Sequence, residues 1–194
     1  MTPRFQLAHD YMMSRLEREL SPRLHYHNVE HVRDVLSAAL RIGQAEGVDT
    51  SGLELIGVAA VFHDSGFILD SKEHEATGVL FARDYLPGLG FSENELEVIC
   101  GMIMATRVPQ QPLNDWQMII CDADLDYLGR KDFFETGNKV FREMVELGQI
   151  ATEREWNEMQ VRFLTEHHYF TQTSIRDRKP QKDAHLEQVK LLLV

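Results

Sequence analysis

Three separated elements of the sequence carry side chains that bind metal ions or transfer protons. The first is the segment YHNVEHV, in which His27 and His31 lie four residues apart. The second is the dipeptide His63–Asp64 in VFHDSGF. Imidazoles and carboxylates together are a typical donor set for an intermediate divalent metal ion. The third element adds further carboxylates, because the segment CDADLDYLG holds Asp122, Asp124 and Asp126.

The apolar surroundings of these side chains favour a metal site over isolated polar residues. His63 follows three apolar residues at helical spacing, so it should face the interior. Asp124 comes four residues after Ile120, and a buried carboxylate is costly unless it is paired or binds a metal. Two simpler interpretations stay open. His63 and Asp64 could be a buried hydrogen-bonded pair, and the acidic cluster could be a solvated helix start.

The elements that position these residues are predicted to be helices, because apolar residues recur at helical spacing along almost the whole chain. Ser71 is a candidate cap for a helix over SKEHEATGVLFARDYL. Capping-box patterns open two further helices, at residues 92–95 and 152–155. The segment WQMII has strand propensity, but we predict a helix because a lone strand would lack a partner. The tail is predicted as a basic loop around Pro180 followed by a short amphipathic helix.

This pattern predicts one all-α domain of about eight or nine helices over residues 1–194. The metal-binding motifs fall in a core of residues 24–129, and further helices follow over residues 131–194. A chain of 194 residues is long enough to bury a core without disulfides or structural metals.

Composition and charge exclude several classes of function. The net charge of −11 argues against binding to nucleic acid, which requires basic residues to neutralise phosphates. The two cysteines, Cys100 and Cys121, form no CxxC pair and are expected to be small buried side chains. We find neither a signal-peptide pattern nor an apolar run long enough for a membrane span. We therefore expect a cytoplasmic protein that binds neither nucleic acid nor membrane; its oligomeric state is left open.

The order H…HD…D resembles the HD superfamily of metal-dependent phosphohydrolases. YHNVEHV is similar to the Tyr-His-Asn-x-x-His motif that opens cyclic-nucleotide phosphodiesterases. The overall layout, with FHDSGF about thirty residues later and then HE, an I-x-A-T segment and DADLDYLG, is more similar to small stand-alone bacterial HD hydrolases. The resemblance covers roughly residues 24–129 and implies a single HD-type helical domain.

The resemblance implies a role for each of these residues. His31, His63 and Asp64 would be metal ligands, and Asp124 the fourth, because it follows a small residue and an apolar pair as the family's last ligand does. Asp122 is the alternative fourth ligand, or a residue that supports a metal ligand without contacting the ion. His27 would not bind metal; it would protonate the leaving oxygen, which suits an imidazole because both of its protonation states are accessible near neutral pH. Asp64, or else Asp124, would accept the proton of the attacking water.

One divalent ion (Mn²⁺, Mg²⁺, Fe²⁺, Ni²⁺ or Zn²⁺) is favoured over two. The acidic pair that follows HD in the stringent-response hydrolases is missing, since this chain reads SGFILD there. Two-metal relatives carry additional histidines. His74 could serve as one, but Thr106 and Arg107 stand near the position where others are expected. A second metal at His74, together with Glu75, is therefore the alternative.

The predicted function is metal-dependent hydrolysis of a phosphate ester or phosphoanhydride, with a nucleotide as the expected substrate. A sensor that binds nucleotide or metal without catalysis is the second interpretation, and a di-iron oxygenase ranks last because it needs more histidine ligands. Candidate donors to the substrate are Asn28, Arg107 and Gln111. A basic cluster after His167 and His168 could gather phosphates, but a solvated loop is the favoured interpretation there.

Overall fold

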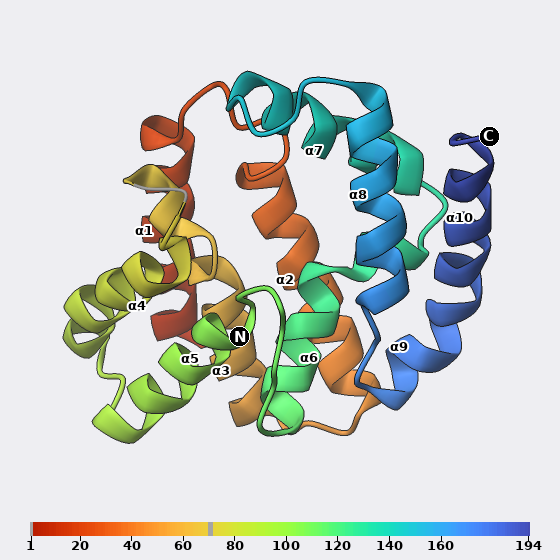
Figure 1. Ribbon diagram of the computed structural model, residues 1–194. Coiled ribbons are helices and arrows are strands. Elements are labelled where there is room, and N and C mark those ends of the chain that lie inside the picture. Colours follow the sequence, from red (N-terminus) through yellow and green to blue (C-terminus); the bar gives the residue numbers. More distant parts are fainter. Residues whose placement is uncertain (1, 70–71) are drawn as a thin grey trace.

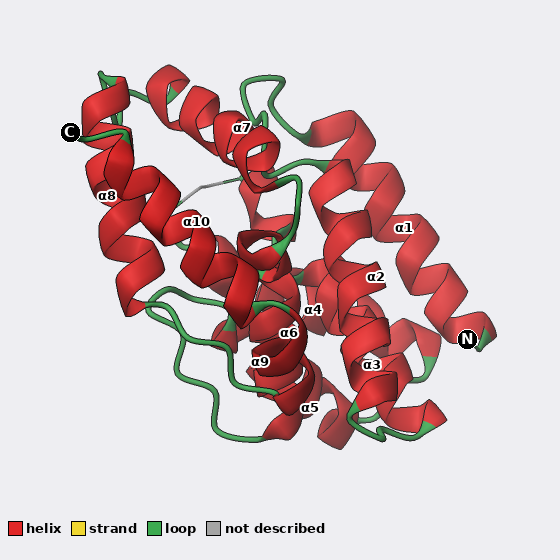
Figure 2. Cartoon of the chain, turned by 90° about the vertical axis from the view of Figure 1, so that its right-hand side faces the viewer, coloured by secondary structure: helices red, strands yellow, loops and turns green. Residues whose placement is uncertain are grey.

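Helices make up most of the chain that the computed structural model describes, residues 2–69 and 72–194 (Figure 2). No strand occurs within these ranges, so the all-α fold class is confirmed. Among the same residues, none of the helices combines the length and apolar character that a membrane span requires. The α-helices are α1 (Pro3–Glu19), α2 (Val29–Ala45), α3 (Thr50–Phe62), α4 (His74–Tyr85), α5 (Glu93–Ala105), α6 (Asp115–Asp124), α7 (Phe133–Glu146), α8 (Glu153–Glu166), α9 (Gln172–Asp177) and α10 (Lys179–Leu191). The short 3-10 helices are η1 (Ser65–Ile68), η2 (Leu86–Leu89) and η3 (Asp126–Gly129).

The tail accounts for the difference between this helix count and the predicted one. The expected basic loop around Pro180 is wrong, because α9 ends at Asp177 and α10 begins at Lys179. Pro180 lies in the first turn of α10, where its missing N–H would have no partner within the helix anyway. Lys182, expected in a solvated loop, is buried and donates to the carbonyl oxygens of Leu164 and His167. The predicted helix over WQMII is confirmed as part of α6.

Local capping explains where several helices begin. The side chain of Asn28 accepts hydrogen bonds from the N–H groups of residues 30 and 31 at the start of α2. The predicted capping boxes are both present, with Ser92 opening α5 and Thr152 opening α8. The proposed cap Ser71 lies outside the described residues, and α4 begins at His74 without a side-chain cap.

Two hydrophobic clusters hold the helices together. The larger one is formed by α1 to α6, and α3 lies at its centre with residues 55–62 buried. The smaller one joins η3, the start of α7, α8 and α10, and α8 and α10 lie across the molecule from α1 (Figure 1). The buried members of the smaller cluster are Leu125, Leu128, Phe133, Leu164, Tyr169 and Val189. The loop after α6 therefore runs from one cluster into the other.

Asp126, the third acid of the predicted cluster, belongs to an ion-pair network and not to the group of histidines. Its buried carboxylate lies 2.7 Å from Arg41 Nη2 on α2 and 2.8 Å from Arg178 Nε at the junction of α9 and α10. Arg130 lies 3.8 Å away and is also paired with Asp34. These contacts fix η3, and with it the end of α6, against α2 and the tail.

An ion-pair network at the N-terminus leads to a prediction about acid stability. Arg4 Nη2 lies 2.7 Å from both Glu54 Oε2 and Glu95 Oε1. The hydrogen bond with Arg4 lowers the pKa of Glu95 from 4.5 to about 2. A carboxyl with a lowered folded-state pKa stabilises the fold above the unfolded pKa, and this stability is lost as the pH falls from 4.5 toward 2. We expect Arg4→Met to reduce the free energy of unfolding by about 1 kcal/mol at pH 7, with a smaller difference near pH 3.

Urea unfolding of both proteins at pH 7 and near pH 3 measures this difference. Arg33→Met is the matched control, because Arg33 forms exposed ion pairs with Glu17 and Glu30. The control should change the unfolding free energy little at either pH. An Arg4→Met deficit that stays constant down to pH 3 would show that the effect comes from packing of Arg4 on Phe91, not from charge.

Candidate active site

Two buried histidines from different helices face each other. His31 lies in the first turn of α2, and His63 directly follows α3. Their Nε2 atoms are 3.4 Å apart. The Nδ1 of His63 is 2.8 Å from the carbonyl oxygen of Ala60, which can only accept, so Nδ1 carries the proton. This bond leaves the Nε2 lone pair of neutral His63 directed at His31, the arrangement of a metal-binding imidazole.

Two carboxylates complete the group. Asp64 Oδ2 lies 3.2 Å from the Nε2 atoms of both histidines. Asp124 Oδ1 lies 3.3 Å from His31 Nε2 and 3.5 Å from His63 Nε2. The donor atoms of His31, His63 and Asp124 all lie within 4.8 Å of one another. The buried Oδ2 of Asp64 accepts no hydrogen bond from the residues that the structure describes.

The charges of this group are strongly coupled. Burial alone would raise the pKa of Asp124, but hydrogen bonds with His31 and His63 lower it to about 2. Burial opposes ionisation of Asp64 as well, yet the neighbouring His63 and His31 hold its pKa well below the usual value. The carboxylates in turn raise the pKa of both imidazoles, against the effect of burial. These two closely spaced carboxylates, one buried and one largely buried, therefore require positive charge beside them, which a divalent cation can supply in place of imidazole protons.

The structure separates the two candidates for the fourth ligand. Asp122 is fully buried and accepts hydrogen bonds from the N–H of Phe170 at 2.9 Å and from the N–H and hydroxyl of Thr171 at 2.8 and 2.6 Å. Residues two apart on a helix point about 200° away from each other, so Asp122 and Asp124 serve opposite sides of α6. Only Asp124 contacts the histidines, whereas Asp122 anchors the segment before α9.

His27 reaches the site from outside the helix. A spacing of four residues predicts that His27 and His31 share a helical face, which is wrong because His27 precedes α2, which begins at Val29. The two rings are nevertheless close, with centroids 5.9 Å apart. The carboxylate of Glu143 on α7 accepts hydrogen bonds from the N–H groups of Tyr26 and His27, at 2.8 and 3.0 Å, and from His27 Nδ1. The segment is thus held by a residue from a distant helix.

Sequence reasoning missed Glu143. Its carboxylate is buried, and although burial opposes ionisation, the hydrogen bonds from His27 and the backbone lower its pKa. The available signal was an acid in an amphipathic helix, between Val140 and Met144, which both line the cavity described below. An acid on the inner face of a helix predicts a partner but does not identify it.

His74 lies beside the four-residue group. Its Nε2 is 3.5 Å from Asp64 Oδ1 and 3.3 Å from Glu75 Oε1. The rings of His27 and His74 stack on Phe67, with centroid distances of 4.3 and 4.2 Å. This packing requires a glycine at position 66, because a Cβ there would lie 1.9 Å from the carbonyl oxygen of His74. The start of α4 is therefore pressed against the HD dipeptide.

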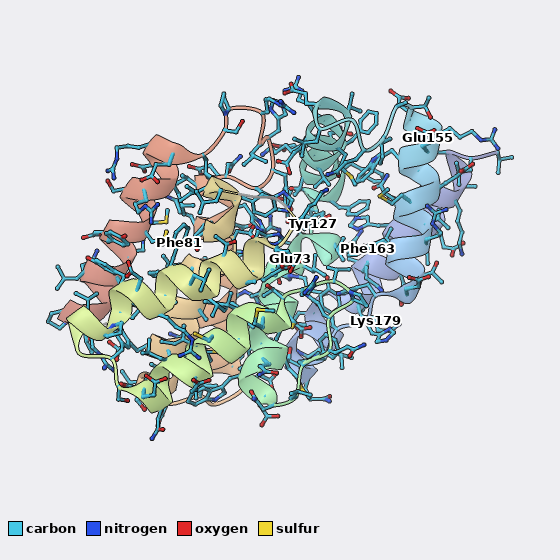
Figure 3. The ribbon with its side chains drawn as sticks, turned by 60° about the vertical axis from the view of Figure 1, so that its left-hand side comes forward. Glu73, Phe81, Tyr127, Glu155, Phe163 and Lys179 are labelled. Carbon is cyan, nitrogen blue, oxygen red and sulfur yellow. The ribbon has the colours of Figure 1, made fainter. Side chains whose placement is uncertain are left out.

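These polar residues form one end of a cavity of about 500 Å³. Arg107 also lines it, half exposed and 3.0 Å from Glu73. Tyr127 and Phe163, which Figure 3 labels together with Glu73, belong to its wall. The other end is apolar, with walls from η3, α7 and α8 that include Leu128, Phe133, Val140, Met144 and Trp156. A charged group fits one end of this cavity and an apolar group fits the other.

Of the three expected substrate donors, only Arg107 lines the cavity. The side chain of Asn28 is already used, because it caps α2 and donates to the carbonyl of His25. Gln111 is exposed and lies outside the cavity walls.

Comparison with known proteins identifies the fold. No protein-family model matches the chain, and no curated protein matches its sequence. One similar solved structure is a predicted HD superfamily hydrolase from an uncultured Thermotogales bacterium, with 20% identity, a TM-score of 0.63 and coverage of 95% of this chain and 90% of that one. Another is Bacillus subtilis YpgQ in complex with ADP, with 18% identity, a TM-score of 0.67 and coverage of 97% and 95%. The chain therefore has the all-α fold of HD-type proteins.

Proposed function

We propose that this protein is a metal-dependent phosphohydrolase that acts on a nucleotide or a related phosphate ester. The observation that carries the proposal is the convergence of two buried imidazoles, the buried carboxylate of Asp64 and the largely buried carboxylate of Asp124 at the polar end of a cavity. A volume of about 500 Å³ lies within the range of small-molecule sites. The two structural neighbours add support, since one is described as a hydrolase and the other holds ADP.

His31, His63, Asp64 and Asp124 would hold one divalent metal ion. Two nitrogen and two oxygen donors suit Mn²⁺, Fe²⁺, Ni²⁺ or Zn²⁺, and Mg²⁺ is the oxygen-preferring alternative. The buried Oδ2 of Asp64 fits such a role, because it accepts no hydrogen bond from the described residues and faces the Nε2 atoms of both histidines at 3.2 Å, and a buried carboxylate oxygen without a donor is costly unless a cation compensates it. When bound, the ion would neutralise charge on phosphoryl oxygens and lower the pKa of a water molecule. A second ion near His74 is the alternative stoichiometry.

The protein's own residues would move the protons. His27 lines the cavity, and its Nδ1 donates to Glu143, so Nε2 is the nitrogen left to protonate the leaving oxygen. Asp64 would accept the proton of the attacking water. Glu143 fixes the orientation of His27, because its carboxylate accepts the hydrogen bond from Nδ1.

The alternative functions rank lower on the same residues. A nucleotide sensor without catalysis would need the fold and the cavity but not all four ligand positions, which are filled here. A di-iron oxygenase needs more histidine ligands than His31, His63 and His74 supply. That residues 1–194 form one domain remains a prediction, and so does the location of the protein in the cytoplasm.

The deciding experiment combines metal analysis with a phosphatase screen. Metal-stripped protein is supplied with each of the five divalent ions in turn. It is then assayed on p-nitrophenyl phosphate, bis(p-nitrophenyl) phosphate and a panel of nucleotides. We expect phosphate-ester cleavage that requires an added ion, with about one ion bound per chain. Nucleotide binding without turnover at any ion would instead support the sensor, and two irons with oxygen consumption would support the oxygenase.

A further inference from the structure

A second, smaller cavity adjoins the apolar part of the first. Its volume is about 140 Å³, and the two cavities share Val108, Leu125 and Phe163 as walls. Phe170 and Pro109 also line it. We refer to this space as the annex. A ligand with its phosphate near Asp124 can extend into the annex past Leu125, the residue that follows Asp124 in the chain.

Two polar groups in the annex wall are buried without hydrogen-bond partners among the described residues. The first is the imidazole of His167, of which neither ring nitrogen has a partner, and the second is the Oε1 atom of Gln110. The orientation of the Gln110 amide is determined by its neighbour: Nε2 donates at 3.3 Å to the carbonyl oxygen of Cys121, which can only accept. Oε1 is therefore the acceptor left over. Buried polar atoms without partners are rare, and each calls for a physical explanation.

The ring of His167 is held in place as a neutral imidazole. Burial, with a smaller contribution from the nearby Lys182, lowers its pKa to about 3. Lys182 also donates to the carbonyl oxygens of Leu164 and His167, which fixes the backbone at the end of α8. The ring packs parallel to Phe163 and edge-on to Tyr169. A neutral imidazole offers one N–H donor and one acceptor nitrogen, so Gln110 Oε1 and His167 together present two acceptors and one donor; Glu166 and His168 also line the annex.

We propose that the annex binds the hydrogen-bonding edge of a planar nitrogen heterocycle, the nucleobase of the substrate. Gln110 Oε1 accepts from an N–H group on the edge of the base, and His167 pairs with a neighbouring donor or acceptor. Phe163 covers a face of the ring, and flat aromatic and apolar walls favour a flat ligand over a flexible chain. This inference rests on the proposed nucleotide phosphohydrolase and names the part of the substrate that the annex reads.

The test measures binding of ligands that lack phosphate, so it does not depend on hydrolysis. Isothermal titration calorimetry of the full chain compares adenosine, guanosine, cytidine and uridine with ribose. We expect at least one nucleoside to bind about tenfold or more tightly than ribose. Gln110→Met and His167→Leu should each weaken that binding by about tenfold, which corresponds to a lost buried hydrogen bond. Gln111→Met, which changes an exposed neighbour outside both cavities, should bind the nucleoside as the wild type does.

Thermal unfolding distinguishes recognition from a structural role. Neither ring nitrogen of His167 bonds to another described residue, so His167→Leu should leave the Tm unchanged or raise it. A fall in the Tm of this variant, or nucleoside binding that is equal in wild type and both variants, would overturn the proposal. Nucleosides that bind no more tightly than ribose would also overturn it. Nucleoside binding in a protein that cleaves no phosphate ester would refute the proposed hydrolysis and leave the annex standing.

Discussion

Replacement of His31 by alanine is expected to remove the metal ion and the phosphohydrolase activity together. His31 Nε2 lies within 3.4 Å of metal-ligating atoms on His63, Asp64 and Asp124, so its loss removes the ligand that is close to all three others. Changes to residues behind metal ligands already cost roughly 10–100-fold in metal affinity, and loss of a ligand should cost more. Excess metal should restore part of the activity, because the remaining three donors are unchanged. Elemental analysis and the phosphatase assay on the same preparation measure both effects.

A pair of conservative substitutions on α6 provides the sharper comparison. Asp124→Asn and Asp122→Asn make the same chemical change two residues apart. Asp124→Asn should lose metal with little loss of fold stability. Asp122→Asn should keep the metal, but its free energy of unfolding should fall by about 1–3 kcal/mol, because the carboxylate accepts hydrogen bonds from the backbone at Phe170 and Thr171.

His185→Ala controls for loss of any buried histidine, since His185 is buried and bonded to the carbonyl of Leu128 outside the group. It should destabilise the fold without changing the metal content. Full metal content in Asp124→Asn together with loss in Asp122→Asn would mean that the fourth ligand is assigned to the wrong aspartate. Retention of metal and activity by His31→Ala would refute the site itself.

The fold could be predicted where its causes are local. Helical spacing of apolar residues and two capping boxes act within a few residues of sequence, and both are present as expected. The segment around Pro180 was ambiguous for a local reason, since proline either breaks a helix or begins one. Contacts with distant residues favour the helical conformation of this segment: Lys182 donates to a carbonyl near the end of α8, and Arg178 pairs with Asp126 on η3. A sequence window around the tail contains neither partner.

The same distinction runs through the candidate site. The types and order of His31, His63 and Asp64 predicted a shared site, and the structure brings them together. The choice between Asp122 and Asp124 needed the position of residues 170–171, which are nearly fifty positions away. Glu143 and its contact with His27 join positions more than a hundred residues apart, and no local pattern identifies such a pair. Residue chemistry was thus readable from the sequence, whereas the pairing of residues across helices was not.

His27→Ala is expected to keep the metal and to lose turnover in proportion to the basicity of the leaving group. General acid catalysis typically contributes about 10²–10⁴-fold, and this full loss is expected for nucleoside monophosphates and cyclic nucleotides, whose leaving alkoxide oxygen needs a proton. For nitrophenyl esters the loss should be small, because nitrophenolate departs without protonation. Glu143→Gln should give a smaller loss of turnover with the same dependence on the leaving group. The amide oxygen can still accept hydrogen bonds from the backbone, but the negative charge beside His27 is removed.

The matched control for both variants is His25→Ala. His25 lies two residues before His27 and also pairs with a glutamate of α7, with Nε2 2.8 Å from Glu146 Oε1, but it does not line the cavity. Its loss should leave kcat unchanged for every substrate, which separates proton transfer from mere attachment of this segment to α7. Equal impairment of His27→Ala on nucleotides and nitrophenyl esters would argue for a structural role of His27, and loss of metal would make it a ligand. A leaving-group dependence shared by His27→Ala and Glu143→Gln, and absent from His25→Ala, requires that the proton pass through the imidazole that Glu143 orients.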